Sequence, residues 1–456
     1  MFELGRELRR FFGPERAKAA TADGLTGGDS TLLELLDARL LAQEARAADV
    51  AAGRISAKDK PRRRLEAAVV WRELARRTGD PVALRKAAAI AETAAAGFET
   101  ARRGDGWARA RCEQAFCALL GGEIFGDPGL DAAAEAAFRE AREAVRGGVA
   151  AALADVGLAA IEARRQLAAA DARAAHAAAD RFSAPIAALD GIAKRVPAAR
   201  TFAAEARLVR ADLLCGWGAR LKDVDLLQEA ADEAADAAER LDSAYEPLTW
   251  ARAKVAYGQA LALRGEAAGD VDALAAGAAA LAISLDHLTR DHSPLDWART
   301  QVALAQALQA LGEAASDARA FEHAVSCYDR AAVVLKLTPS LPLRGLAAGA
   351  RAVCLARCAE ITGDLAVLDA AEAAMKIELS RLSPRRDPVG WALAQLHLAR
   401  LYEARIAMAG QERGERAAAL IALEAALDVF GDHGMRSLSV LAADAMARLR
   451  EPGSAG

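Results

Sequence analysis

The sequence predicts an all-α protein, an α-solenoid of about eight stacked helix-turn-helix repeats with capping helices. Three observations lead to this fold class. The chain has 456 residues, whereas a single hydrophobic core stops growing at about 250–300 residues. It is rich in alanine, the strongest helix former, while aromatic residues make up only 5% and no alternating strand pattern is evident. Aspartates recur every 47 residues, which is typical of a stacked array without a globular centre.

Composition excludes several other classes of protein. The net charge of −4 and the isoelectric point near 6.0 argue against a general nucleic-acid binder. The hydrophobic fraction of 54% argues against a disordered chain. Neither a signal-peptide-like stretch nor an uncharged run of about 18–20 apolar residues occurs, and none of the six cysteines forms a C-x-x-C pair. We therefore expect a cytoplasmic protein with reduced thiols, and its alanine and arginine content is typical of a GC-rich bacterial genome.

Residues 1–12 predict a short basic amphipathic helix. Its apolar side chains are Phe2, Leu4, Leu8, Phe11 and Phe12, and its basic side chains are Arg6, Arg9 and Arg10. Such a helix can fold back onto the first repeat, dock on a partner or lie on an anionic membrane surface, and the sequence leaves these alternatives open. The candidate docking residues are Phe2, Leu8, Phe11 and Phe12. Membrane contact is expected only through this segment.

The next part of the chain links this helix to the repeats. Residues 13–30 are rich in glycine and alanine and predict a linker. Residues 31–61 predict an N-terminal capping element with a helix over 31–53. Thr31 and Glu34 have the spacing of a capping box, in which the Glu side chain reaches back to the start of its own helix.

Residues 62–430 predict the solenoid, and residues 431–456 a C-terminal capping helix with a short tail. The helix pairs are expected at about 62–102, 107–146, 149–195, 198–241, 247–289, 294–336, 342–381 and 388–430. The third pair is irregular, because Asp171 opens its second helix at a shifted spacing and Pro185 lies within it. Proline removes a backbone donor and clashes with the preceding turn, so we expect this helix to kink or break.

Each repeat contains a helix-turn-helix corner marked by an aspartate. The aspartates are Asp80, Asp127, Asp223, Asp270, Asp317 and Asp364, spaced by 47 residues with one double gap of 96. An aspartate before a helix can accept hydrogen bonds from the free N–H groups of its first turn. In Gly79-Asp80-Pro81 the glycine can close the preceding helix and the proline suits the first helical position.

The helices on both sides of each corner have an apolar stripe. After most aspartates come a large apolar residue at +4, a small one at +7 and a variable apolar one at +11, as in Leu227, Ala230 and Ala234. These offsets lie on one helix face. The preceding helices share a second pattern, because Trp250 recurs as Trp297 after 47 residues and as Trp391 after 141. We expect the side chains of both stripes to be buried in the hydrophobic core.

The repeat resembles the tetratricopeptide repeat, whose pattern is Trp, Leu-Gly and Tyr on the first helix and Ala, Phe and Ala on the second. The matching residues are Trp297, Leu304, Ala305 and Leu308, then Ala324, Tyr328 and Ala331, with Tyr257-Gly258 closest to the Leu-Gly step. The usual period is about 34 residues, so each repeat here carries about 13 more. The resemblance implies a right-handed superhelix that holds a protein or peptide in its concave groove. It places five residues on that groove: Arg252, Gln259, Arg299, Gln306 and Arg400.

No catalytic or phosphate-binding motif stands out, and we expect neither enzymatic activity nor a cofactor. The segment 121–129, GGEIFGDPG, lacks the lysine of a phosphate loop and predicts a turn. Cys354 with Cys358, and His287 with His292, are pairs that could bind a metal, but a tetrahedral site needs four ligands. Buried thiols and surface histidines are the simpler interpretation.

Three functions are compatible with such a chain. The first is a non-enzymatic scaffold or adaptor that binds a protein or peptide in the groove. The second is a regulatory sensor that binds a small ligand or signalling peptide. The third is a peripheral membrane-associated assembly factor that uses residues 1–12. The charge balance predicts no nucleic-acid partner for any of them.

Overall fold

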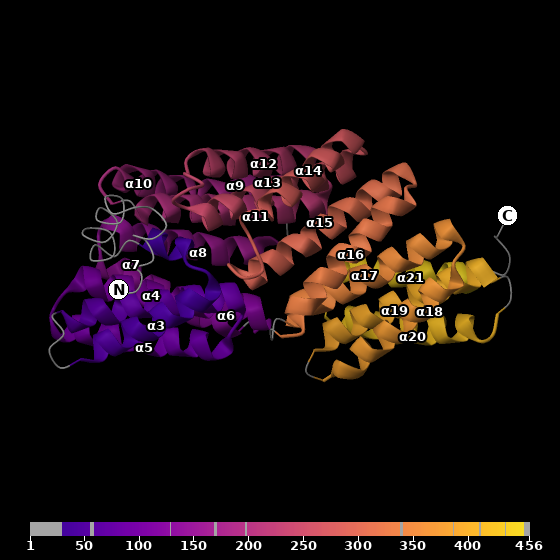
Figure 1. The fold of residues 1–456 in the computed structure, drawn as a ribbon, viewed down its shortest axis with the longest axis horizontal. Coiled ribbons are helices and arrows are strands. Elements are labelled where there is room, and N and C mark those ends of the chain that lie inside the picture. The colour runs from indigo at the N-terminus through magenta and orange to yellow at the C-terminus, as the bar shows by residue number, and fades with distance from the viewer. Residues whose placement is uncertain are drawn as a thin grey trace. The chain divides into compact units, whose positions relative to one another are not determined.

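The computed structural model describes residues 30–54, 59–127, 129–167, 171–196, 198–337, 341–385, 387–409, 412–433 and 435–450. Within these ranges the regular secondary structure is helical, without strands, and consecutive helices pack on one another (Figure 1). The chain divides into two compact units. Unit 1 comprises residues 1–303 with 337–340, and unit 2 comprises residues 304–336 with 341–456. The predicted all-α solenoid of stacked helix pairs is confirmed.

The described part of unit 1 consists of η2 and α3 followed by helix pairs. The elements are η2 (Ser30–Leu35), α3 (Ala38–Gly53), α4 (Lys60–Thr78), α5 (Pro81–Thr100), α6 (Gly104–Phe125), α7 (Gly129–Ala144), α8 (Gly148–Leu167), α9 (Ala172–Asp180), α10 (Ser183–Ala193), α11 (Ala198–Leu221), α12 (Val224–Glu239), α13 (Pro247–Ala268) and α14 (Val271–Ser284). The next helix, α15 (Pro294–Ala315), begins in unit 1 and ends in unit 2.

Unit 2 continues the same alternation. Its remaining helices are α16 (Ala318–Leu335), α17 (Leu341–Thr362), α18 (Leu365–Arg381), α19 (Pro388–Ala409), α20 (Glu415–Asp432) and α21 (Arg436–Arg450). The eight predicted helix pairs are therefore present among the described residues, with bounds within a few residues of the expected ones.

The aspartates form the predicted caps at all six corners. Each side chain accepts a hydrogen bond of 2.8–3.0 Å from a backbone N–H of the following turn. The residue before the aspartate lies in the left-handed region in each corner. It is a glycine in four corners, but Lys222 and Ser316 in the other two, at φ 54° and 51°. Non-glycine residues are strained in this region, so two corners store strain that the others avoid.

An exchange of residues between two corners of unit 2 tests this. We expect Ser316→Gly to raise the free energy of unfolding by about 0.5–1 kcal/mol, and Gly363→Ser to lower it by about 1 kcal/mol. Both positions precede a capping aspartate, and the φ of Gly363 is 75°. Urea denaturation of each full-length variant measures the change. Two shifts in the same direction would contradict the assignment of strain to the left-handed conformation.

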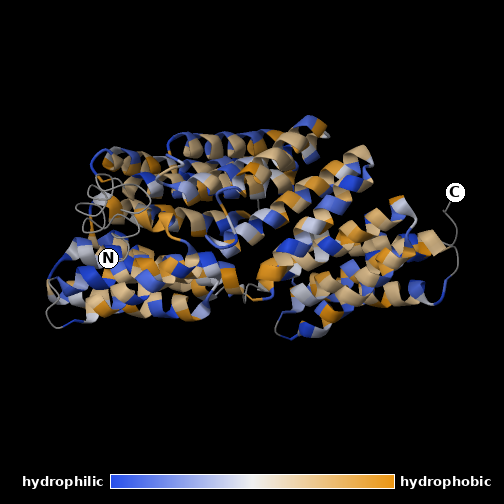
Figure 2. Cartoon of the chain, viewed as in Figure 1, coloured by the Kyte–Doolittle hydropathy of each residue, from blue (hydrophilic) through white to orange (hydrophobic). Residues whose placement is uncertain are grey.

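The predicted stripe on the second helices is buried in every repeat. At the +11 position, Phe138 and Leu281 have no exposed surface and Met375 is 3% exposed. Hydrophobic and hydrophilic residues alternate along the helices, as one buried face per helix requires (Figure 2). The tryptophan of the first helices is less buried than expected. Trp250 is half-buried and packs edge-on against His287, with ring centroids 4.7 Å apart.

The third pair is broken where the sequence predicts it. Asp171 caps α9 by accepting from the N–H of Ala174 at 2.7 Å. The chain then turns at Arg181 and Phe182 before α10 begins at Ser183. Pro185 lies in the first turn of α10, where its missing N–H is not needed.

The N-terminal element differs from the prediction. The single helix expected over 31–53 is divided into the 3-10 helix η2 and the α-helix α3. Asp37 caps α3 by accepting from the N–H of Leu40 at 2.7 Å. The capping-box prediction for Glu34 is wrong, because its carboxylate bonds to Leu248 and Thr249 at the start of α13. A tertiary contact has replaced the local one.

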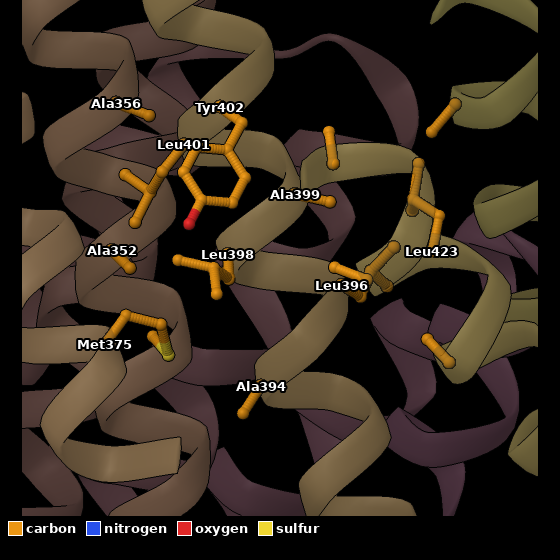
Figure 3. Packing of buried hydrophobic residues seen from close by; sticks show 14 of the residues in the cluster. Ala352, Ala356, Met375, Ala394, Leu396, Leu398, Ala399, Leu401, Tyr402 and Leu423 are labelled. Atoms are coloured by element: carbon orange, nitrogen blue, oxygen red, sulfur yellow. The ribbon is translucent and has the colours of Figure 1, made fainter. Parts of the chain in front are cut away.

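The core of unit 2 shows how the small residues work. Figure 3 shows Tyr402 and Leu398 of α19 facing Ala352 and Ala356 of α17 and Met375 of α18. Alanine on α17 lets the larger side chains of α19 fill the space between the helices. The result is a continuous seam from one pair to the next.

Candidate functional site

The first helices of the pairs in unit 1 contact one another across its inner surface. Arg76 of α4 forms an ion pair of 2.8 Å with Glu205 of α11, although 129 residues separate them. Arg299 of α15 forms one of 2.6 Å with Glu123 of α6. The curvature of unit 1 thus places its first two pairs opposite its later ones, with charged side chains between them.

Glu73 of α4 is the centre of this charged surface. Its carboxylate lies 2.7 Å from Arg76, 2.7 Å from Arg77 and 3.9 Å from Arg252 of α13. Burial disfavours the charged carboxylate, but the three guanidinium groups outweigh it and hold the pKa of Glu73 well below its usual range. We call Glu73, Arg76, Arg77, Arg252 and Asp296 the Glu73 cluster.

Asp296, at the start of α15, completes the cluster. Its carboxylate accepts hydrogen bonds from Arg252 at 2.9 Å and from the Ser293 hydroxyl at 2.7 Å. Burial opposes its ionisation, yet Arg252 and Arg299 lower its pKa. The Nη1 of Arg252 is buried and has no hydrogen-bond partner among the described residues. The cluster therefore joins three first helices and leaves one donor available.

The lowered pKa values predict acid sensitivity. Groups with a depressed pKa in the folded state stabilise it above their unfolded pKa, and this contribution is lost as the pH falls through the folded pKa. For Glu73 and Asp296 the ordinary values are 4.5 and 3.8. Glu34 acts in the opposite sense, because burial raises its pKa and protonation relieves that penalty. Among all described carboxyls with a shifted pKa, those with a lowered pKa outnumber those with a raised one, so we expect a net loss of stability in acid.

We therefore expect the free energy of unfolding to fall steadily from about pH 4.5 to about pH 2. Urea denaturation across this range measures it. The Asp296→Asn variant provides the comparison, since it is less stable near neutral pH but has a flatter pH dependence. Equal slopes for the two proteins would show that Asp296 is not ionised in the folded state.

A second charged group joins α4, α6 and α11. Arg72 of α4 donates to Glu113 of α6, whose side chain is fully buried. Arg109 of α6 lies over the ring of Phe202 of α11, 4.7 Å from the ring centroid. Burial lowers the pKa of Arg109, against the attraction of Glu113. Oε2 of Glu113 and Nη1 of Arg109 have no partner among the described residues.

Residues 30–37, which we call the 30–37 segment, lie against the Glu73 cluster. The carboxylate of Glu34 accepts from the backbone N–H groups of Leu248 and Thr249, both at 2.9 Å, and from the Thr249 hydroxyl. These N–H groups belong to the first turn of α13 and have no partner within that helix. Glu34 is 5% exposed, and burial raises its pKa although Arg252 opposes the shift.

Arg77 binds the backbone of the same segment. Its Nη1 donates to the carbonyl of Leu36 at 2.6 Å and its Nη2 to that of Leu33 at 2.9 Å. The Arg77 side chain is 0% exposed, and Glu73 balances its charge at 2.7 Å. One arginine therefore joins the 30–37 segment to the Glu73 cluster.

The loop before α15 holds the segment from the other side. The Nε2 of His292 lies 2.6 Å from the carbonyl oxygen of Glu34. The N–H of Ala38, which follows the segment, donates to the carbonyl of Asp291 at 3.0 Å. Burial, together with the charge of Arg77, lowers the pKa of His292. A neutral imidazole can donate to this carbonyl without adding charge to the cluster.

The structure brings together only some of the groove residues expected from the sequence. Arg252 and Arg299 both lie near Asp296 in unit 1, where they pair with Asp296 and Glu123 respectively. Gln259 is exposed on α13. Gln306 and Arg400 belong to unit 2, where Gln306 is exposed and Arg400 pairs with Glu360 at 2.7 Å. The N-terminal docking residues Phe2, Leu8, Phe11 and Phe12 lie outside the described residues.

Of the residues that bind the 30–37 segment, only His292 was a candidate from the sequence, as a metal ligand; Arg77 and Thr249 were not. Arg76-Arg77 directly follow an apolar helix face, and Glu34 lies among four leucines. A charged residue within an apolar run is a signal of a buried ion pair, but no local spacing connects position 34 with position 77 or 249.

The other candidate chemistry has ordinary structural roles. His287 packs on Trp250, and His292 binds a backbone carbonyl. Cys354 and Cys358 are buried, and burial raises both thiol pKa values, that of Cys354 to about 12. Among the residues that the structure describes, no group of three His, Cys, Asp or Glu side chains could hold a metal ion. None of the described helices is long and apolar enough to cross a membrane.

The fold and this surface define a helical-repeat protein. No protein-family model matches the chain, and no curated protein matches it. Among solved structures it is similar to a Rap protein crystallised in complex with competence and sporulation factor. The alignment has 10% sequence identity and a TM-score of 0.44, and covers 86% of this chain and 98% of that one.

Proposed function

We propose that this protein is a non-enzymatic binding scaffold of the tetratricopeptide-repeat type, which holds a protein or peptide on the inner surface of unit 1. The supporting observation is the convergence of arginine side chains from several first helices on that surface. Arg72 and Arg76 come from α4, Arg109 from α6, Arg252 from α13 and Arg299 from α15. Guanidinium groups bind carboxylates in a fixed geometry and also bond to backbone carbonyls.

Two features favour recognition over a purely structural role. Buried N–H groups of Arg109 and Arg252 have no partner within the described residues, and such groups are costly unless a ligand or water satisfies them. Arg299 is 30% exposed and its partner Glu123 is 48% exposed. A ligand can therefore break this ion pair without exposing the hydrophobic core. Exposed Gln259 can bond to a peptide backbone. Gln306 and Arg400 would form a separate contact on unit 2.

The experiment is affinity purification of the full-length chain followed by mass spectrometry. The test variant is Arg299→Glu. Its exposed ion pair with Glu123 contributes only about 0–1 kcal/mol to stability. Because Arg299 also favours the charged form of buried Asp296, the variant must keep the circular dichroism spectrum of the wild type. The matched control is Arg85→Glu on α5, where the side chain is exposed. We expect the control to retain the wild-type set of partners and Arg299→Glu to lose at least one of them. Equal sets for all three proteins would remove the inner surface of unit 1 as the binding site.

The sensor alternative is tested separately by a thermal-shift screen of peptides and metabolites. A ligand that binds only the folded state raises the melting temperature. A small molecule that raises it, with no protein retained by affinity purification, would favour the sensor over the scaffold.

A further inference from the structure

The 30–37 segment is held as a bound peptide is held, not as a repeat helix is held. Leu32, Leu33 and Leu36 are 7%, 2% and 4% exposed, so the apolar side chains enter the protein. Its backbone carbonyls are bound by the side chains of Arg77 and His292, from residues 41 to 258 positions away in sequence. Side-chain recognition of main-chain carbonyls is a peptide-binding mode that any chain segment of suitable shape could use.

The contacts also select for one chemical group at the centre of the segment. The carboxylate of Glu34 accepts two backbone N–H bonds and the Thr249 hydroxyl bond at the first turn of α13. Such charge-assisted bonds are stronger than neutral ones, and the helix dipole favours an anion here. An occupant of this site therefore needs an acidic residue flanked by leucines.

The segment lies on α4, α11 and α13, and each of these helices also packs on other helices of the array. The helix that follows the segment, α3, packs against α4. Burial of Glu34 and of Arg77 works against their charged forms, since it raises the pKa of Glu34 and lowers that of Arg77. The segment thus loses part of the free energy of its contacts to desolvation, so these contacts hold it less tightly than their number implies.

We propose that the 30–37 segment is an intramolecular ligand that covers a peptide site on unit 1, and that the partner in trans presents a short peptide with an acidic residue between leucines. The site is formed by Arg77, the α13 N-terminus with Thr249, and His292. This inference deepens the proposed binding function and rests on it. The covalent link gives the segment a high effective concentration, on the order of millimolar, so the site is closed to weak competitors.

The test measures binding of a fluorescein-labelled peptide with the sequence STLLELLD, which is that of residues 30–37, to full-length protein by fluorescence anisotropy. In the variant Leu33→Asp, a charge replaces a side chain that is 2% exposed, so the segment should leave the site. Leu35→Asp is the matched control, because Leu35 is only half-buried. We expect Leu33→Asp to bind the peptide at least about tenfold more tightly than either wild type or Leu35→Asp.

A second peptide tests the chemistry of recognition. With the substitution Glu34→Gln in the peptide, we expect binding to Leu33→Asp to weaken by about tenfold or more, because the charge-assisted bonds are lost. A Leu33→Asp protein that keeps its circular dichroism spectrum but binds neither peptide would overturn the proposal. Equal binding of both peptides would overturn the requirement for a carboxylate.

A milder full-length variant covers the case in which Leu33→Asp does not fold. Glu34→Gln in the protein keeps size and shape but loses the charge, and should admit the acidic peptide more readily than wild type does. Equal affinity of wild type and this variant would then overturn the proposal. The affinity purification with Arg299→Glu is a separate experiment. If it shows loss of a partner while the peptide experiments fail, the proposed binding function stands and only the role of the 30–37 segment is overturned.

Discussion

Replacing Arg77 by methionine is expected to lower the free energy of unfolding by about 3–5 kcal/mol. Its side chain is 0% exposed and forms a 2.7 Å ion pair with Glu73. It also donates to the carbonyls of Leu33 and Leu36 at 2.9 and 2.6 Å. Methionine has a similar length but no charge. The variant therefore leaves the Leu36 carbonyl without its donor, takes one of two bonds from the Leu33 carbonyl, which still accepts from the N–H of Leu36 at 3.1 Å, and removes one of the positive charges beside Glu73. Urea denaturation followed by circular dichroism gives the size of the loss.

The control is Arg85→Met on the neighbouring helix α5. Arg85 is exposed, and surface substitutions change stability by only about 0.5 kcal/mol. The double variant Arg77→Met/Glu73→Gln removes both members of the pair, but Glu73 also neutralises Arg76 and Arg252. We therefore expect it to lose more stability than Arg77→Met alone. A loss of less than about 1 kcal/mol in Arg77→Met would mean that the buried ion pair is not formed as described.

The architecture was predictable because its signals are local and repeated. Asp270 specifies the start of a helix through bonds to the next few residues, and the same arrangement recurs after 47 residues at Asp317. The break of the third pair was equally local, because Pro185 acts only on its own turn and on the one before it, where the chain turns at Arg181 and Phe182. Because each repeat carries its own start and stop signals, a wrong prediction for one repeat does not affect the prediction for the next repeat.

The candidate site was only partly predictable, for the opposite reason. The resemblance to tetratricopeptide repeats indicated Arg252 and Arg299, which both lie near Asp296, while their role in binding stays a prediction. It could not indicate Arg77 or Glu34, because their contacts depend on how far the array curves. That curvature is the sum of small rotations between pairs, set by packing of many small side chains. The wrong prediction for Glu34 has the same origin, since a local capping bond was replaced by a contact 214 residues away.

The packing that sets this curvature can be tested at Gly277 on α14. We expect Gly277→Ala to lower the free energy of unfolding by about 2–3 kcal/mol. A Cβ at this position would lie 2.7 Å from the carbonyl oxygen of Gly258 and 2.8 Å from the backbone N of Ala262, both on α13. These are backbone atoms, so the two helices must separate. The gain of about 1 kcal/mol that alanine brings to a helix interior is too small to compensate.

The same substitution should have the opposite sign where there is room. Gly191 lies in α10, also in unit 1, and a Cβ there would meet no atom within 4 Å. Gly191→Ala is therefore expected to raise the free energy of unfolding by about 0.5–1 kcal/mol through helix propensity alone. Urea denaturation of both variants compares them directly. If Gly191→Ala also lowers the free energy of unfolding, the loss in Gly277→Ala cannot be assigned to close approach of the helices. If the two variants change the free energy of unfolding in opposite directions, the need for glycine at position 277 lies in the contact between α13 and α14. The contact between α13 and α14 also fixes the angle between these two helices. We therefore expect Gly277→Ala, but not Gly191→Ala, to weaken the hydrogen bonds between Glu34 and the start of α13. Faster hydrogen exchange of the Leu248 and Thr249 amides would measure this weakening.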